Sequence, residues 1–152
     1  MMFKVPGPPQ GKARARTFYN PNINKMSSIT PEKTVLYENL IKQCYLASHM
    51  ADKRYMDNEP LEMEITAIYD IPMSVSNKRR DRMLKSFEYP TKKPDIDNIA
   101  KVVCDALNGV AYKDDKQIVS LKLAKRYGSL PMVVIDINEI KDCLLYTSDA
   151  AD

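Results

Sequence analysis

The chain has 152 residues, of which 44% are hydrophobic and 28% are charged, a composition typical of one water-soluble folded domain that buries its own core. No apolar run approaches the roughly 20 residues that span a bilayer, and Met1 to Gln10 lacks an apolar signal core, so we expect neither a membrane protein nor a secreted one. The formal net charge is only +3, but the bases are concentrated in two segments.

The N-terminal half of the chain predicts two strands separated by a helix. Met1 to Val5 is a short strand, and "PGPPQGKARARTFYNPN" after it is predicted to be an irregular surface segment, because Pro and Gly interrupt it. Thr30-Pro31 predicts a helix start, with a hydroxyl N-cap and proline in the first turn, and "EKTVLYENLIKQCYLASHM" continues that helix. The alternation in "LEMEITAIYDI" predicts a strand that buries one face.

The C-terminal half predicts two helices followed by two strands. The segment "SNKRRDRMLKSFEY" is expected to be a basic helix, followed by an extended linker that Pro90 and Pro94 bracket. The next helix should begin at Asp95 and stop at Gly109, because glycine favours the left-handed conformation that ends many helices. "QIVSLKLAKRY" and "MVVIDINEI" are predicted alternating strands, and the "GSLP" between them predicts a hairpin.

The order of these elements predicts the fold class. It favours a single α+β domain over residues 1–142, with a small mixed β-sheet packed against α-helices. Residues 143–152, "CLLYTSDAAD", have no clean period and resemble the translated adapter tails that contaminate some sequence assemblies. We expect this tail to be disordered or non-native, and we base no functional argument on it.

The bases lie in two segments. Residues 78–93 carry seven bases and two acids, and Lys4, Lys12, Arg14 and Arg16 follow one another near the N-terminus without an acid. Two basic patches on a nearly balanced protein indicate an anionic partner, and nucleic acid is the commonest soluble one. From charge alone, surfaces that are merely solvated are an equally good interpretation.

Acidic residues lie at both ends of the predicted helix. At about 100° per residue its apolar side chains share one broad arc, while Asp97 and Lys101 lie four residues apart on the opposite side. Structural roles explain these acids: Asp95 as an N-cap, and Asp97 as a first-turn acid that suits the helix dipole and as an ion-pair partner of Lys101. The Asp114-Asp115 pair is typical of a turn. On spacing alone the structural interpretation is the stronger one.

The same acids also suit a metal site. Mg²⁺ prefers hard oxygen ligands and usually takes one or two carboxylates. Asp95, Asp97 and one of Asp114 and Asp115 could supply them if the start of the next strand folds back beside the start of the helix. A cation would relieve the repulsion between these acids and activate water for phosphodiester hydrolysis. Lys101 would hold the scissile phosphate or stabilise developing negative charge.

Other chemistries find less support. A calcium loop that starts at Asp95 would need glycine and glutamate where this chain has Ala100 and Ala106. The single histidine, His49, is expected on a helix face rather than in a catalytic triad. The three cysteines show no Cys-x-x-Cys spacing for zinc or a disulfide framework, which favours a reducing cytoplasm.

The stretch "KPDIDNIAKVVCDALNGVAYKDDKQIV" resembles the RusA family of Holliday junction resolvases. The matching features are Lys-Pro-Asp-x-Asp-Asn, a lysine three residues on, Asp-Ala-Leu-Asn-Gly, and Asp-Asp before an x-Gln-Ile/Val strand. The N-terminal "VPGPPQGKARAR" is also similar to the family's opening strand and basic loop, with Ala15 where the family often has proline. The similarity in organisation covers roughly Met1 to Ile140, and the strong motifs lie in residues 92–119.

The resemblance implies a small homodimeric endonuclease, often phage or prophage encoded, that resolves four-way DNA junctions by paired symmetric nicks in recombination and repair. It implies Mg²⁺ as cofactor, with Mn²⁺ as a substitute, and the cytoplasm of a bacterial or phage-infected cell. Two symmetric nicks in a near two-fold junction require two sites related by a two-fold axis, which favours a homodimer.

The resemblance also assigns residues by position. It makes Asp95, Asp97 and Asp115 the metal-binding catalytic carboxylates and Lys101 the catalytic lysine. Asp114 is a further metal-ligand candidate, because adjacent residues on an extended segment point in opposite directions. The DNA-binding candidates are Lys12, Arg14, Arg16, Arg79, Arg80, Arg82 and Lys93.

Two alternatives stay open. One is a less selective structure-specific nuclease that acts on flaps or replication forks. The other is a non-catalytic DNA-binding protein whose acids only cap helices and form turns, in which case Asp97→Asn would leave every activity intact.

Overall fold

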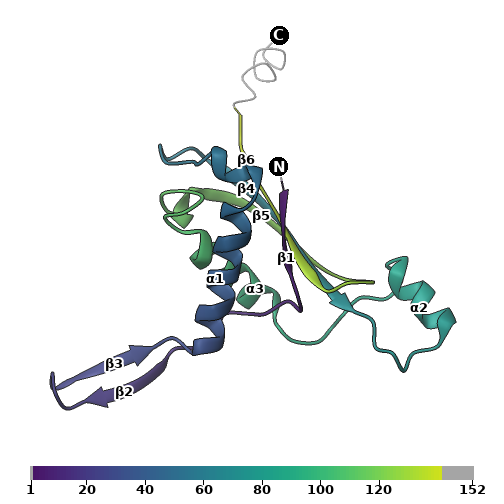
Figure 1. Ribbon diagram of the computed structural model, residues 1–152, viewed down its shortest axis with the longest axis horizontal. Coiled ribbons are helices and arrows are strands. Elements are labelled where there is room, and N and C mark those ends of the chain that lie inside the picture. The colour runs from purple at the N-terminus through teal and green to yellow at the C-terminus, as the bar shows by residue number, and fades with distance from the viewer. Residues whose placement is uncertain (1, 142–152) are drawn as a thin grey trace, which may run out of the picture.

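The computed structural model describes residues 2–141, which form a four-stranded mixed sheet, a separate two-stranded ribbon and three α-helices (Figure 1). The predicted α+β class with a mixed sheet is therefore confirmed, while the predicted tail 143–152 lies outside the described residues. In chain order the elements are β1 (Met2–Pro6), β2 (Arg16–Asn20), β3 (Lys25–Ile29), α1 (Glu32–Leu46), the 3-10 helix η1 (His49–Asp52), β4 (Leu61–Asp70), α2 (Asn77–Leu84), α3 (Ile96–Leu107), the 3-10 helix η2 (Asp115–Gln117), β5 (Ile118–Gly128) and β6 (Met132–Glu139).

The sheet has the strand order β1-β6-β4-β5. Strand β4 pairs antiparallel with β6 and parallel with β5, and β1 pairs antiparallel with β6. The alternation predicted for β4 is confirmed, because Leu61, Met63 and Ile65 are buried while Glu62 and Glu64 are exposed. A strand that buries one full face against helices can occupy the centre of such a sheet, and β4 does so.

The predicted hairpin between β5 and β6 is wrong, because β4 lies between these two strands. The two strands still run in opposite directions, since one is parallel and the other antiparallel to β4. Strands separated by one neighbour are about 10 Å apart, and a three-residue loop can cross that distance. A short loop between alternating strands is therefore compatible with two topologies, and the sequence pattern alone favoured the wrong one.

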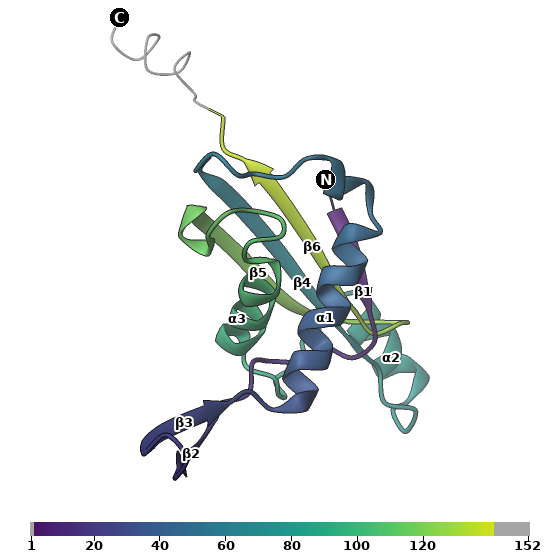
Figure 2. The same cartoon turned by 60° about the vertical axis from the view of Figure 1, so that its left-hand side comes forward.

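Helices α1 and α3 lie side by side on one face of the sheet (Figure 2). The core-facing side of α3 consists of Ile99, Val102, Val103, Ala106 and Leu107, none of which is measurably exposed. This matches the apolar arc predicted for the helix, and burial of these side chains contributes about 1.5–3 kcal/mol for each of the larger ones. The helix is thus held rigidly on the sheet, with its polar side outward.

The predicted ends of α3 are correct to within two residues, whereas the predicted start of α1 and the predicted end of α2 differ from the structure. Helix α1 begins at Glu32, with Pro31 rather than Thr30 at the N-cap and no side-chain capping hydrogen bond, so the hydroxyl cap was wrong. Helix α3 has Asp95 at its N-cap, and Gly109 follows it with φ of +73°, as the glycine predicted. Helix α2 stops at Leu84, about one turn and a half earlier than the predicted segment 76–89.

The sequence predicted an irregular segment after β1. This prediction is wrong for part of the segment, which contains the ribbon β2–β3. The ribbon projects away from the sheet and its helices in both views (Figures 1 and 2). Its two strands pair in register from Arg16 opposite Ile29 to Asn20 opposite Lys25. No helix among residues 2–141 has the length and apolar character needed to cross a membrane.

Candidate active site

Helix α3 displays the first two predicted carboxylates at its N-terminal end. Asp95 occupies the N-cap position without making a capping hydrogen bond, and Asp97 lies in the first turn. Strand β4 fixes the approach to this end, because the hydroxyl of Tyr69 donates a hydrogen bond to the carbonyl of Pro94 at 3.3 Å. Burial, together with the nearby charge of Asp95, raises the pKa of Tyr69 to about 12. The carboxylate of Asp95 is thus held near the end of β4.

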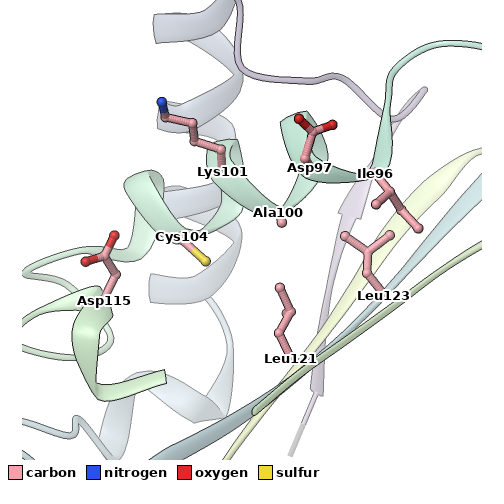
Figure 3. Close-up of a pocket in the computed structure, with 8 residues that line it drawn as sticks. All are labelled: Ile96, Asp97, Ala100, Lys101, Cys104, Asp115, Leu121 and Leu123. Carbon is pink, nitrogen blue, oxygen red and sulfur yellow. The ribbon is translucent and has the colours of Figure 1, made fainter. Parts of the chain in front are cut away.

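Asp97 and Lys101 project from the same side of α3, as Figure 3 shows. Although they are four residues apart, their side chains form no ion pair with each other in the described part of the chain. The interpretation of Asp97 as an ion-pair partner that stabilises the helix through Lys101 is therefore not supported by a contact between the two side chains. Both side chains are available to another group.

The Asp114-Asp115 pair divides into two different environments. The Asp114 carboxylate accepts a hydrogen bond from the backbone N–H of Lys116 at 3.0 Å, and this bond lowers the pKa of Asp114. The Gln117 side chain completes a capping box by accepting from the backbone N–H of Asp114 at 3.0 Å. The turn interpretation is therefore correct for Asp114.

Asp115 faces a groove between α3 and β5 instead (Figure 3). Burial raises the pKa of this carboxyl group, and so do the neighbouring carboxylates of Asp114 and Asp105. An acid in such surroundings gains stability from a nearby cation. Of the adjacent pair, Asp115 is the residue that lines the groove, where a cation could reach its carboxylate.

The groove has a volume of about 620 Å³ and combines an apolar floor with a charged rim. Leu121 and Leu123 of β5 lie opposite Ala100 and Ile96 of α3. Ile96 belongs to the arc that the sequence predicted to be buried, yet its side chain is 48% exposed because it lines this groove. The charged groups at the groove are those of Asp97, Lys101 and Asp115.

The carboxylates predicted to bind a metal do not lie together within a single copy of the chain. Among residues 2–141 no three His, Cys, Asp or Glu side chains lie close enough together to hold a metal ion. The start of β5 does not fold back beside the start of α3, because the hydroxyl of Tyr112 donates to the carbonyl of Cys104 at 2.8 Å and holds the connecting turn at the other end of the helix. Asp115 consequently lies near Cys104. Burial of the Cys104 thiol, together with the negative charge of Asp115, raises the pKa of the thiol to about 11.

The predicted DNA-binding bases also fall into two groups. Lys12 pairs with Glu38 and, at 3.1 Å, with Asp105, and Arg79 pairs with Glu88 at 2.6 Å. These two bases are already neutralised by partners in the fold. In the described chain Arg14, Arg16, Arg80 and Arg82 form no ion pair, and Lys93 lines a separate pocket of about 380 Å³ with Lys33 and Gly11.

Sequence reasoning missed the apolar side of the site. The i, i+2 spacing of Leu121 and Leu123 indicates one strand face, but periodicity cannot show that α3 leaves part of this face uncovered. It also missed Glu38 and Asp105, the partners that neutralise Lys12. Both features depend on contacts between elements that are distant in the sequence.

Comparisons with known proteins agree with the motif at this site. A family model described as endodeoxyribonuclease RusA matches residues 6–138. The chain is also similar to a protein of Bacillus subtilis (strain 168) described as uncharacterized protein YqaN, with 43% identity over 83 residues. That similarity spans 53% of this chain and 58% of the length of the relative.

Proposed function

The chain belongs to the endodeoxyribonuclease RusA family, and from this premise we propose that it is a Mg²⁺-dependent endonuclease that resolves four-way DNA junctions by paired symmetric nicks. The observation that carries the proposal is the groove between α3 and β5, which gathers Asp97, Lys101 and Asp115 on one surface. Its setting would be recombination and repair in the cytoplasm of a bacterial or phage-infected cell.

The donor groups fit a divalent metal. Carboxylate oxygens are the ligands that Mg²⁺ prefers, and Mn²⁺ accepts the same ligands. Asp97 and Asp115 would hold the ion, with Asp95 as a further ligand, while Asp114 is less suited because its carboxylate caps η2. When bound, the metal would lower the pKa of a water and offset charge on the phosphate oxygens.

Lys101 has a role of its own in this proposal. Its ammonium group lies between the two carboxylates along α3 and has no ion-pair partner among the described residues. A free cation at a phosphodiester-cutting site can hold the scissile phosphate and stabilise the negative charge that develops on it. The uncompensated bases Arg14, Arg16, Arg80 and Arg82 would hold flanking phosphates.

A homodimer would remedy the separation of the carboxylates. The groove leaves the apolar side chains of Leu121 and Ile96 exposed by 44% and 48%, and β5 is an edge strand of the sheet. Such a surface favours association with another protein surface. A two-fold axis near the middle of α3 would bring the Asp97 end of one copy beside the Asp115 end of the other, and two such sites would serve two nicks.

The non-catalytic alternative has one specific observation in its favour. Asp114 is part of a capping box, as that interpretation requires. Asp95 makes no capping bond and Asp97 forms no ion pair with Lys101, so the same interpretation retains for these two acids only their favourable position at the N-terminus of the helix dipole. A less selective nuclease would use the same groove and differs only in its substrate.

The testing experiment measures strand cutting of a labelled synthetic four-way junction beside a linear duplex of the same sequence. Each substrate is incubated with Mg²⁺, with Mn²⁺ and with EDTA. We expect paired symmetric nicks in the junction only, and only with metal. Cutting of flaps or forks at the same rate would favour the less selective nuclease, and tight binding without cutting would favour the non-catalytic protein.

A further inference from the structure

The ribbon β2–β3, residues 16–29, exposes apolar side chains that no other described element covers. Phe18, Tyr19, Ile23 and Met26 are exposed by 46%, 56%, 57% and 67%. The ribbon extends beyond α1 and away from the sheet (Figures 1 and 2). An isolated two-stranded ribbon is at best marginally stable in water, and exposed apolar groups do not contribute to its folding. Their exposure suggests a partner outside the chain.

The register of the ribbon separates its side chains onto two faces. Directly opposed residues of an antiparallel pair point to the same face, so Tyr19 and Met26 form an apolar pair on one side. The other side carries Phe18 between Arg16 and Lys25. The ribbon therefore carries both apolar side chains and positively charged side chains within one narrow element.

Asparagines fix the tip of the ribbon. The side chain of Asn20 accepts a hydrogen bond from the backbone N–H of Asn22 at 3.1 Å, and the Tyr19 hydroxyl donates to the side chain of Asn24. Asn24 adopts a φ of +51°, a conformation that asparagine tolerates well. The turn therefore presents Ile23 at the tip in a defined position.

The segment that leads into the ribbon is fixed to helix α3. The backbone N–H of Lys12 donates to the carbonyl of Asn98 at 2.9 Å, one residue after Asp97. This approach requires glycine at position 11, because a Cβ there would lie 2.8 Å from the Cβ of Asn98. The ion pairs of Lys12 with Glu38 and Asp105 reinforce the attachment. The position of the ribbon relative to Asp97 is thus set by the fold.

Charge indicates what the ribbon meets. The first 31 residues contain no acid and five bases: Lys4, Lys12, Arg14, Arg16 and Lys25. Only Lys12 among them forms an ion pair with a described residue, and of the other four, Arg14, Arg16 and Lys25 lie in the ribbon or next to it. A polyanion complements this charge, and the apolar tip requires a polyanion that offers apolar faces. Nucleic acid offers such faces where bases are unstacked, as at a branch point, but not along a stacked duplex.

We propose that the ribbon inserts at the branch point of DNA, with Ile23, Tyr19 and Met26 against unstacked bases and with Arg14, Arg16 and Lys25 on the flanking phosphates. This inference rests on the proposed function and specifies how a branched substrate is distinguished from a duplex. Because the segment that leads into the ribbon contacts α3 beside Asp97, insertion would also set the distance from the branch to the cut.

The test uses a four-way junction with 2-aminopurine beside the branch, and a linear duplex with the same label, both in EDTA so that cutting does not interfere. The variant Ile23→Ser with Met26→Ser leaves the Tyr19–Asn24 hydrogen bond in place. Leu130→Ser is the control, because Leu130 is 65% exposed in the loop between β5 and β6, away from the ribbon. Thermal unfolding confirms that both variants are folded.

We expect the wild type and the control to raise the fluorescence of the label in the junction. The double variant should bind the junction about tenfold more weakly and lose most of the fluorescence rise, while its duplex binding stays within about twofold of wild type. Unchanged junction binding and fluorescence would overturn the inference. An equal loss on the duplex would overturn it too, as would dissociation of a dimer by the variant in sedimentation velocity, since the ribbon would then meet a second copy.

The outcome is separable from the proposed function. Cutting of an unlabelled junction by the wild type with Mg²⁺ is scored independently. If the wild type cuts junctions but the double variant still unstacks the branch, only the role of the ribbon fails. If the wild type binds junction and duplex equally, the proposed preference for junctions fails, and the ribbon inference fails with it.

Discussion

The groove between α3 and β5 and the ribbon β2–β3 both expose apolar side chains, but they differ in their surroundings. The groove is recessed between a helix and a sheet, and two carboxylates lie at its rim. The ribbon projects from the molecule, and its neighbouring charges are positive. The same apolar exposure therefore leads to different proposals: a second protein surface and a metal for the groove, and unstacked bases for the ribbon.

The largest effect should come from the acids of the groove. Asp97→Asn and Asp115→Asn should each reduce junction cutting by at least about a hundredfold, since even outer-shell changes at metal sites cost about 10–100-fold. Junction binding should stay near wild type. The measurement is the single-turnover cutting rate with Mg²⁺.

Asp114→Asn is the matched control for these acids. Asparagine is also a good capping residue, so the capping box of η2 should persist and cutting should fall far less than with Asp115→Asn. Equal losses of cutting for Asp114→Asn and Asp115→Asn would contradict the assignment of Asp115 alone to the site. Full cutting by Asp97→Asn would remove that residue from the mechanism.

The next effect concerns the apolar floor of the groove. Leu121→Glu should weaken self-association by about thirtyfold, because a buried anchor of an interface can contribute about 2 kcal/mol or more. Sedimentation velocity over a range of protein concentrations measures it. Leu130→Glu, at an exposed loop position outside the groove, should leave association unchanged, and dissociation of both variants would contradict the assignment of the interface.

A smaller effect concerns Cys104, which lines the same groove. Burial raises the pKa of its thiol to about 11, so the reactive thiolate fraction should rise about tenfold per pH unit between pH 8 and pH 10. Peptide mass spectrometry after iodoacetamide treatment follows this site separately from Cys44. A rate that levels off by pH 9 would mean that the thiol is solvated.

The smallest effects should distinguish two basic residues near the start of the ribbon, Lys12 and Arg16. Lys12→Gln removes the partner of Glu38 and Asp105, so it should lower the free energy of unfolding by about 1 kcal/mol. Arg16→Gln should leave stability unchanged but reduce the salt dependence of DNA binding by about one unit of the logarithmic slope. Urea unfolding and binding titrations at several salt concentrations test both, and the reverse result would exchange the two roles.

Much of the fold could be predicted because its elements carry local periodicity. The alternation of β4, the apolar arc of α3 and the glycine at position 109 each have a physical signature within a few residues. The ribbon was missed because its exposed strands have no buried face and hence no alternation to detect. The hairpin between β5 and β6 was wrong because a loop length does not report which strand lies between.

The sequence by itself determined which residues are candidates for the site, because the motif that contains Asp95, Asp97, Lys101 and Asp115 is a property of the chain. Only the tertiary structure decided that Asp115 rather than Asp114 faces the groove, and that the carboxylates at the two ends of α3 stay apart within one chain. It also decided that Lys12 is neutralised while Arg16 is not. Contacts between residues far apart in sequence decide each of these points, and such contacts leave no local pattern in the sequence.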